Sequence, residues 1–131
     1  MGFVKDKITI FGYATAIKKK TYEALFDSGA CRNYISKELS DGITVDNIGY
    51  PILMAPRDVR LANGHIESCE VIKFREIRIK NHSIEMPEFL VMDNLTEDVI
   101  IGARLMQEMK ILLNPPNHSI IIRHSVPTGG G

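Results

Sequence analysis

An aspartate followed by small residues comes directly after an apolar stretch, in the tetrapeptide Asp27-Ser28-Gly29-Ala30. The residues before it, Tyr22 to Phe26, are typical of a β-strand. A carboxylate at the end of a buried strand is costly unless it has a partner, and Gly29 lets another backbone segment approach closely. These features would suit a carboxylate that is held rigidly beside another group, as a catalytic acid must be. The composition is also that of an ordinary turn, so the tetrapeptide alone leaves both interpretations open.

A second motif, Ile100-Ile101-Gly102, follows Asp98 and leads into a predicted short helix from Gly102 to Met109. Two branched residues and a glycine could pack against the Asp27 loop from below. A plain connection from a strand to a helix would have the same composition. The motif therefore indicates a function only in combination with the other motifs.

A third motif, Ala62-Asn63-Gly64-His65, lies between two predicted strands, Val59 to Leu61 and Ile66 to Ile72. Asn-Gly is a strong signal for a tight hairpin, because a type I′ turn needs positive φ at both central residues. The tip of such a hairpin could fold over a cleft and shield a reaction from water. A simple surface hairpin is the alternative.

The rest of the chain, which must position these three motifs, is predicted to be mostly β. Short alternating stretches bounded by Gly, Pro, Asn and Asp predict strands and turns, and neither an internal repeat nor a domain boundary is apparent. We therefore expect one domain over residues 1–126 and a flexible tail over 127–131. The further predicted strands are Ile8 to Ile17, Phe74 to Lys80, Ile84 to Val91, Ile111 to Leu113 and Ser119 to Ile122, with Pro87 as a sign of an edge or bulge and Lys18 to Lys20 as a solvated turn. Asn33 to Ser36 is predicted as a short strand or a turn, with Ser36 as the cap of a short helical turn that contains Lys37, Glu38 and Leu39.

The amino-acid composition and the charge balance limit the classes of function that fit this chain. Sixteen basic residues balance sixteen acidic ones in 131 residues, so no overall field favours nucleic acid or a membrane. Neither a signal peptide nor an apolar run of about 20 residues is apparent. The two cysteines, Cys31 and Cys69, lack zinc-type spacing, and the histidines are scattered. We expect free thiols in a reducing cytoplasm and no metal, with a Cys31–Cys69 disulfide as the alternative.

In combination, the three motifs resemble the retropepsin-like (retroviral-type) aspartic proteases, in particular prokaryotic-type members. Phe26 to Ala30 is similar to the hydrophobic-Asp-Thr/Ser-Gly-Ala/Ser signature of that family. Ala62-Asn63-Gly64 stands where its members carry the flap. Asp98 to Met106 resembles their hydrophobic-hydrophobic-Gly-x-x-Leu segment, which opens the single helix. The order and spacing agree from about Ile8 to Ile122.

The resemblance implies an all-β fold, a closed retropepsin-like barrel with a flap hairpin and one short C-terminal helix. It also implies an aspartic endopeptidase without a cofactor, active on peptides only as a homodimer, because the chain has one Asp-Ser/Thr-Gly motif. The two aspartates would share a proton and activate water. The site residues implied are Asp27 as the catalytic carboxylate, Ser28, Gly29 and Ala30 as the active-site loop, Ala62, Asn63, Gly64 and His65 as the flap, and Ile100, Ile101 and Gly102 as the supporting loop.

Two positions depart from the family pattern. Cys31 and Arg32 stand where retroviral members often carry two acids that help to bind the substrate backbone. This difference keeps a second hypothesis open, a catalytically inactive module for dimerisation or peptide binding. A third is an unrelated small β-barrel with chance motifs. Cys31 is expected either to be an inert buried thiol or to make activity sensitive to redox conditions.

Overall fold

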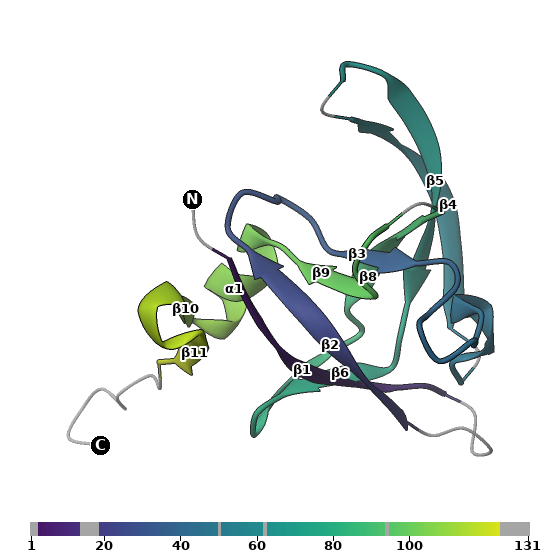
Figure 1. Cartoon of the computed structure of the whole chain (residues 1–131). Coiled ribbons are helices and arrows are strands. Elements are labelled where there is room, and N and C mark those ends of the chain that lie inside the picture. The colour runs from purple at the N-terminus through teal and green to yellow at the C-terminus, as the bar shows by residue number, and fades with distance from the viewer. Residues whose placement is uncertain (1–2, 14–18, 50, 62, 94, 124–131) are drawn as a thin grey trace, which may run out of the picture.

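The computed structural model describes residues 3–13, 19–49, 51–61, 63–93 and 95–123, and strands dominate them (Figure 1). One α-helix, α1 (Ala103–Met109), and two 3-10 turns, η1 (Val45–Asn47) and η2 (Pro115–Asn117), accompany the strands in these residues. The strands are β1 (Phe3–Phe11), β2 (Lys19–Asp27), β3 (Tyr34–Ser36), β4 (Ile52–Arg60), β5 (Ile66–Lys73), β6 (Glu76–Ile79), β7 (His82–Glu85), β8 (Glu88–Met92), β9 (Val99–Ile101), β10 (Ile111–Asn114) and β11 (Ser119–Ile122).

The strands form two sheets within the described residues. The larger has nine strands in the order β4-β5-β8-β3-β9-β2-β1-β6-β7, and the smaller pairs β10 with β11. The predicted all-β class with one short helix is confirmed. The larger sheet ends at β4 and β7 in this order, so closure into a barrel stays a prediction. None of the described helices has the length and apolar character needed to cross a membrane.

The first hairpin pairs β1 with β2 along their full length, from Phe3 opposite Asp27 to Phe11 opposite Lys19. The side chains alternate between core and solvent, as a strand with one buried face requires. The prediction placed the turn at Lys18 to Lys20, but Lys19 and Lys20 belong to β2. Pairing with β1 extends the strand, and exposed lysines are compatible with its outer face.

A second difference from prediction occurs at Pro87. The segment from Ile84 to Val91 was expected as one strand, but it divides into β7 and β8. Met86 has φ of 51°, in the left-handed region, and proline has no N–H to continue a ladder. The chain therefore changes neighbours here: β7 pairs with β6, whereas β8 pairs with β5 and β3.

Most of the buried apolar side chains form one cluster, to which the β1–β2 hairpin, the central strands, α1 and the small sheet contribute. A second, smaller cluster consists of Cys69, Val71 and Leu90. Phe26, Phe74 and Phe89 are fully buried within the larger cluster, and the rings of Phe74 and Phe89 meet edge to face at 5.6 Å. Burial of each such side chain contributes on the order of 2 to 3 kcal/mol. Phe26 fixes the end of β2, so the residue that follows it starts from a rigid position.

Candidate active site

Asp27 is the last residue of β2 and is half-buried. Its Oδ1 accepts a hydrogen bond of 2.8 Å from the N–H of Gly29, and its carbonyl accepts one of 3.1 Å from the N–H of Ala30. The segment is thus a tight turn, as its composition indicated. The same turn orients the carboxylate, because the bond from Gly29 fixes one of its two oxygens. The two interpretations of the tetrapeptide are compatible.

The supporting segment β9 lies between the two strands that flank the Asp27 loop. It runs parallel to β2, with Phe26 opposite Ile101, and antiparallel to β3, with Tyr34 opposite Ile100. The loop from Ser28 to Asn33 must therefore cross the end of β9, which Figure 1 shows beside α1. The structure thus brings together the first two sequence motifs, although 69 residues separate Asn33 from Gly102.

Gly102 stands at that crossing. A Cβ atom there would lie 2.3 Å from the carbonyl oxygen of Arg32 and 2.8 Å from that of Ala30. Glycine is needed because the two backbones touch, and not because of a special φ. Next to it, the N–H of Ala103 donates to the carbonyl of Ala30 at 2.7 Å. The Asp27 loop is therefore tied to the start of α1 by backbone contacts.

Asn33 completes this connection, a role that its position in the sequence did not indicate. Its Oδ1 accepts a 3.0 Å hydrogen bond from the N–H of Gly102, and its Nδ2 donates to the carbonyl of Glu88 at 3.2 Å. Its own carbonyl accepts from the N–H of Leu90. One side chain thus links the Asp27 loop, the start of α1 and β8. The only signal in the sequence was a polar residue between a small-residue loop and an apolar strand.

The β4–β5 hairpin carries the third motif at its tip. The N–H of Leu61 donates to the carbonyl of His65 at 2.8 Å, and Gly64 has φ of 87°. The N–H of Gly64 also donates to the carbonyl of Leu61 at 2.9 Å, so Asn63-Gly64 is not the central pair of the hydrogen-bonded turn, as the predicted type I′ turn requires. Oδ1 of Asn63 accepts from the N–H of His65 at 3.0 Å. Ala62, the remaining residue of the predicted flap, lies outside the described residues.

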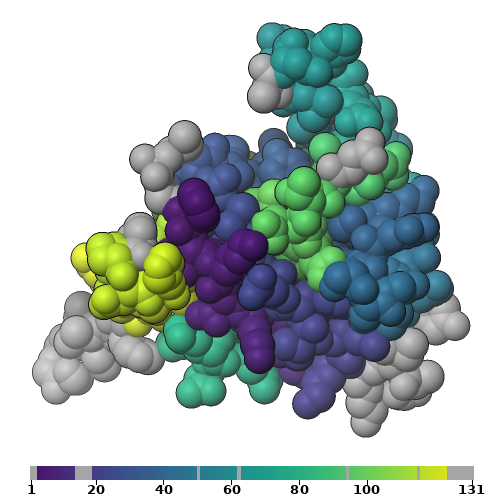
Figure 2. Space-filling view, viewed as in Figure 1, coloured from purple at the N-terminus to yellow at the C-terminus, as the bar shows by residue number. Residues whose placement is uncertain are grey.

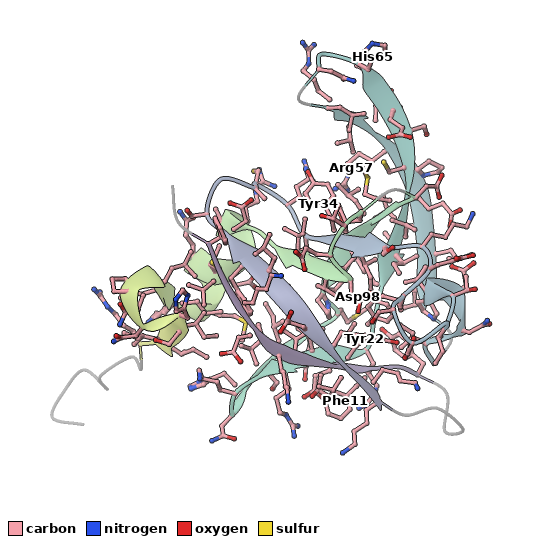
Figure 3. The ribbon with its side chains drawn as sticks, in the orientation of Figure 1. Phe11, Tyr22, Tyr34, Arg57, His65 and Asp98 are labelled. Carbon is pink, nitrogen blue, oxygen red and sulfur yellow. The ribbon has the colours of Figure 1, made fainter. Side chains whose placement is uncertain are left out.

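The hairpin stands away from the body of the molecule. Figure 2 shows it as a separate projection, and Figure 1 shows its tip on the same side as the loop after β2, with space between them. Figure 3 places His65 at the tip. The chain itself therefore does not bring the third motif into contact with the first two.

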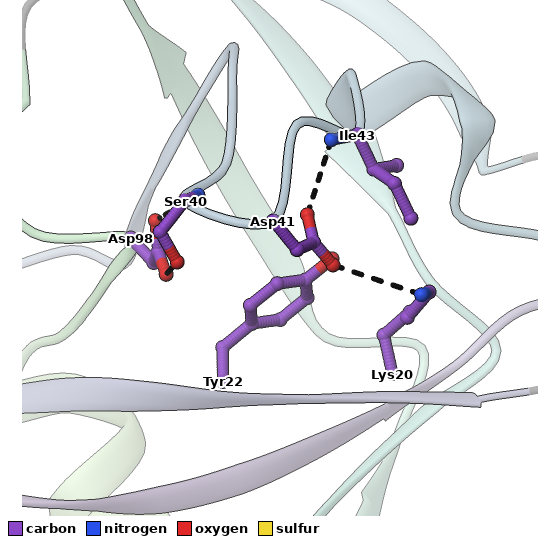
Figure 4. A network of polar contacts seen from close by, with 6 residues as sticks. All are labelled: Lys20, Tyr22, Ser40, Asp41, Ile43 and Asp98. Carbon is purple, nitrogen blue, oxygen red and sulfur yellow. Dashed lines mark hydrogen bonds and ion pairs between the residues drawn. The ribbon is translucent and has the colours of Figure 1, made fainter.

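A polar network holds the segment before β9. Asp98 accepts bonds from the N–H of Ser40 at 2.8 Å and from its hydroxyl at 2.5 Å (Figure 4). The carbonyl of Asp98 accepts from the N–H of Ser36 at 2.9 Å. Ser36 was expected to cap a helical turn, but it ends β3 and its hydroxyl donates to the carbonyl of Glu38. Asp98 thus fixes where β9 begins.

Asp41 forms the second part of this network (Figure 4). Its Oδ2 accepts from the hydroxyl of Tyr22 at 3.0 Å and lies 3.6 Å from the ammonium of Lys20, while Oδ1 accepts from the N–H of Ile43. Burial opposes ionisation, but these donors together hold the pKa of Asp41 below its usual value. Burial, and then the bond to Asp41, raise the pKa of Tyr22.

Both cysteines are free thiols, so the disulfide alternative is wrong. Cys69 is buried and Cys31 is exposed; the expectation of a buried Cys31 is therefore also wrong. The loop turns its side chain outward because the backbone carbonyls of this segment face Gly102 and α1. Within the described part of the chain, no group of three His, Cys, Asp or Glu side chains is arranged to hold a metal ion.

Comparisons with known proteins agree with this geometry. A family model described as aspartyl protease matches residues 8–105. The retroviral protease-like domain of Ddi1 from Leishmania major is similar in structure, with a TM-score of 0.56, 18% identity, and coverage of 93% of this chain and 85% of that one.

A retropepsin-like aspartic protease from Rickettsia conorii gives a TM-score of 0.51 at 16% identity, with 86% of this chain and 88% of that one covered. A search of curated proteins found no match. At these identities the structures establish the fold, and the family model establishes the family. The chain belongs to the aspartyl protease family and has the retropepsin-like fold.

Proposed function

We propose that the protein is an aspartic endopeptidase that works as a homodimer, with Asp27 of each chain as the catalytic pair. The observation that carries the proposal is the position of Asp27. It follows the buried Phe26, one of its oxygens is oriented by Gly29, and its loop is backed by Gly102. The sequence contains one Asp-Ser/Thr-Gly motif, so a pair of such acids requires a second chain.

Two close carboxylates cannot easily both ionise, and they therefore share one proton. The ionised member takes a proton from a water molecule, whose oxygen attacks the carbonyl carbon of the peptide. The protonated member donates to the carbonyl oxygen, and collapse of the tetrahedral intermediate releases an amine and a carboxylic acid. The two roles belong to the pair and not to a fixed chain.

The substrate would lie extended between the Asp27 loops and the β4–β5 hairpins. An extended peptide bonds through its backbone to neighbouring strands, and a hairpin closing over it excludes water. We assign the flap to Ala62, Asn63, Gly64 and His65, of which the last three are exposed. We extend the proposal to cleavage between apolar residues.

Exposed apolar side chains offer a surface for the second copy. Phe3 is 64% exposed, Leu112 42% and Ile121 47%. They lie on β1, β10 and β11, and β1 is in contact with both strands of the small sheet. Grouped apolar side chains that remain in solvent are typical of interaction sites.

A second function rests on one observation. Arg32 and the exposed Cys31 occupy positions where retroviral members often carry acids that help to bind the substrate backbone. A chain that binds peptides without cutting them would tolerate this change. The intact Asp27-Ser28-Gly29 motif favours the protease, because a binding module has no need for an acid there.

The deciding experiment is cleavage of a mixed peptide library at acidic to neutral pH by wild type and by Asp27→Asn. Cleavage by wild type alone, rising faster than linearly with protein concentration where dimer is scarce, is the expected result. Cleavage that survives in Asp27→Asn rules out Asp27 as the catalytic acid. No cleavage at a concentration where the dimer is verified by sedimentation favours the binding module.

A further inference from the structure

A small pocket lies beside the loop that carries Asp27. Its walls come from that loop, from the β4–β5 hairpin, from β8 and from the start of α1. It is thus assembled by the elements that hold Asp27 together with the hairpin proposed as the flap. Its volume is about 140 Å³, and it is lined by Arg32, Asn33, Arg57, Glu88, Leu90 and Arg104.

Three of these six residues are arginines, and Glu88 is the one acid among them. Its Oε1 lies 2.7 Å from Nη1 of Arg57, so these two charges neutralise each other. The ion pairs in the described part of the chain include neither Arg32 nor Arg104. The pocket therefore holds two guanidinium groups whose charge no described carboxylate neutralises.

Arg32 lines the pocket from the loop after Asp27, and Arg104 lines it from the first turn of α1. The charge of Arg32 acts on Tyr34, whose pKa is raised by burial and is pulled back by this arginine. Arg104 also lines a neighbouring pocket with Glu85 and Glu108, but neither acid forms an ion pair with it. Both arginines thus remain available to an anion.

The position of the pocket indicates where such an anion would come from. Arg32 is five residues after Asp27 in the same loop, and Arg57 lies on β4 where the hairpin leaves the sheet (Figure 3). A peptide held between the loop and the hairpin would pass this pocket. A carboxylate accepts two parallel hydrogen bonds from a guanidinium group, and the pocket is wide enough for one.

We infer that this pocket is a substrate subsite for an acidic side chain, with Arg32 and Arg104 as the donors to its carboxylate. The Arg57–Glu88 pair forms the wall that connects the subsite to the hairpin. The inference rests on the proposed function, because it assigns the anion to the bound peptide. It gives the protease a preference for Asp or Glu at one position near the cleaved bond.

The test begins with a peptide that wild type cleaves, blocked at both ends so that side chains carry its only carboxylates. Each residue is replaced in turn by Glu, by the isosteric Gln and by Lys. At one position we expect kcat/KM to be about 5- to 10-fold higher for Glu than for Gln, the range of a partly exposed charged hydrogen bond. Arg32→Glu should reverse this preference in favour of Lys.

Arg104→Ala should reduce the same preference for Glu over Gln. It is the second variant if Arg32→Glu does not fold, and circular dichroism shows whether each variant is folded. Arg78→Ala is the matched control, because it removes an arginine from β6, outside the pocket. It should keep the wild-type ratio of Glu to Gln. Equal rates for Glu and Gln at every position, or a preference that survives both pocket variants, would overturn the inference and leave the proposed function intact.

If the protein cleaves no peptide, the proposed function is refuted. Peptide binding then tests whether the pocket accepts an acidic side chain. Fluorescence anisotropy of labelled Glu and Gln peptides on wild type and on both pocket variants gives the affinities. Tighter binding of a Glu peptide that is lost in Arg32→Glu or Arg104→Ala supports an acid subsite. Equal binding of the Glu and Gln peptides overturns it.

Discussion

Asn33 and Gly102 are joined by a hydrogen bond of 3.0 Å from the backbone N–H of Gly102 to Oδ1 of Asn33. The same Asn33 side chain donates to the carbonyl of Glu88. This contact connects the loop that carries Asp27 to β8 and to the start of α1. These hydrogen bonds of Asn33 therefore help to hold the candidate catalytic carboxylate of Asp27 in place.

Replacing Asn33 with alanine should destabilise the fold. The N–H of Gly102 belongs to a buried residue and would lose its acceptor, which costs about 1 to 3 kcal/mol. Urea unfolding followed by circular dichroism measures the change. Asn81→Ala, at the exposed turn between β6 and β7, is the control and should stay within about 0.5 kcal/mol of wild type. Equal stability of both variants would contradict the role given to Asn33.

Replacing Gly102 with alanine should be more damaging than replacing Gly42. The new Cβ would lie 2.3 Å from a backbone oxygen, and overpacking of this kind costs about 1 to 3 kcal/mol or more. Gly42→Ala is the comparison, since Gly42 has φ of 84° and nothing within 4 Å of a Cβ. It should lose only about 1 kcal/mol for the unfavourable φ. Thermal unfolding of both variants tests this order.

The Asp41 network should make stability fall in acid. The pKa of Asp41 is lowered in the folded protein, so its contribution is present above the unfolded pKa and is lost as the pH falls through the folded value. That window lies below about pH 4. Because Asp41 is largely exposed, the loss should not exceed about 1 kcal/mol. Asp41→Asn should flatten the pH dependence of urea unfolding there, and an unchanged slope would argue against the network.

A charge on the small sheet should weaken the proposed dimer. Ile121 is 47% exposed on β11, and Ile121→Lys would place an ammonium group in the proposed interface. Sedimentation should show more monomer, and cleavage at low protein concentration should fall by about tenfold for each 1.4 kcal/mol lost. Met86→Lys is the matched control, because Met86 is 48% exposed between β7 and β8. Dissociation in both variants, or in neither, would place the interface elsewhere.

The sequence by itself determined the elements and the candidate acid. Period-two alternation predicted the strands around Ile8, Phe26 and Ile77, because a strand with one buried face must alternate. The motif at Asp27 and the helix after Gly102 could also be recognised, because each depends on residues that are neighbours in the sequence. Strand ends were less predictable: β4 begins at Ile52, and its exposed residues give no alternation that marks a strand.

Only the tertiary structure decided how the motifs meet. The crossing of the Asp27 loop over β9, the role of Asn33 and the pocket that brings together Arg32, Arg57 and Arg104 depend on contacts between residues far apart in the chain. Local sequence patterns report which face of an element is buried, but not which element will cover it. Long-range packing settles that, and it places the arginines beside the candidate catalytic loop.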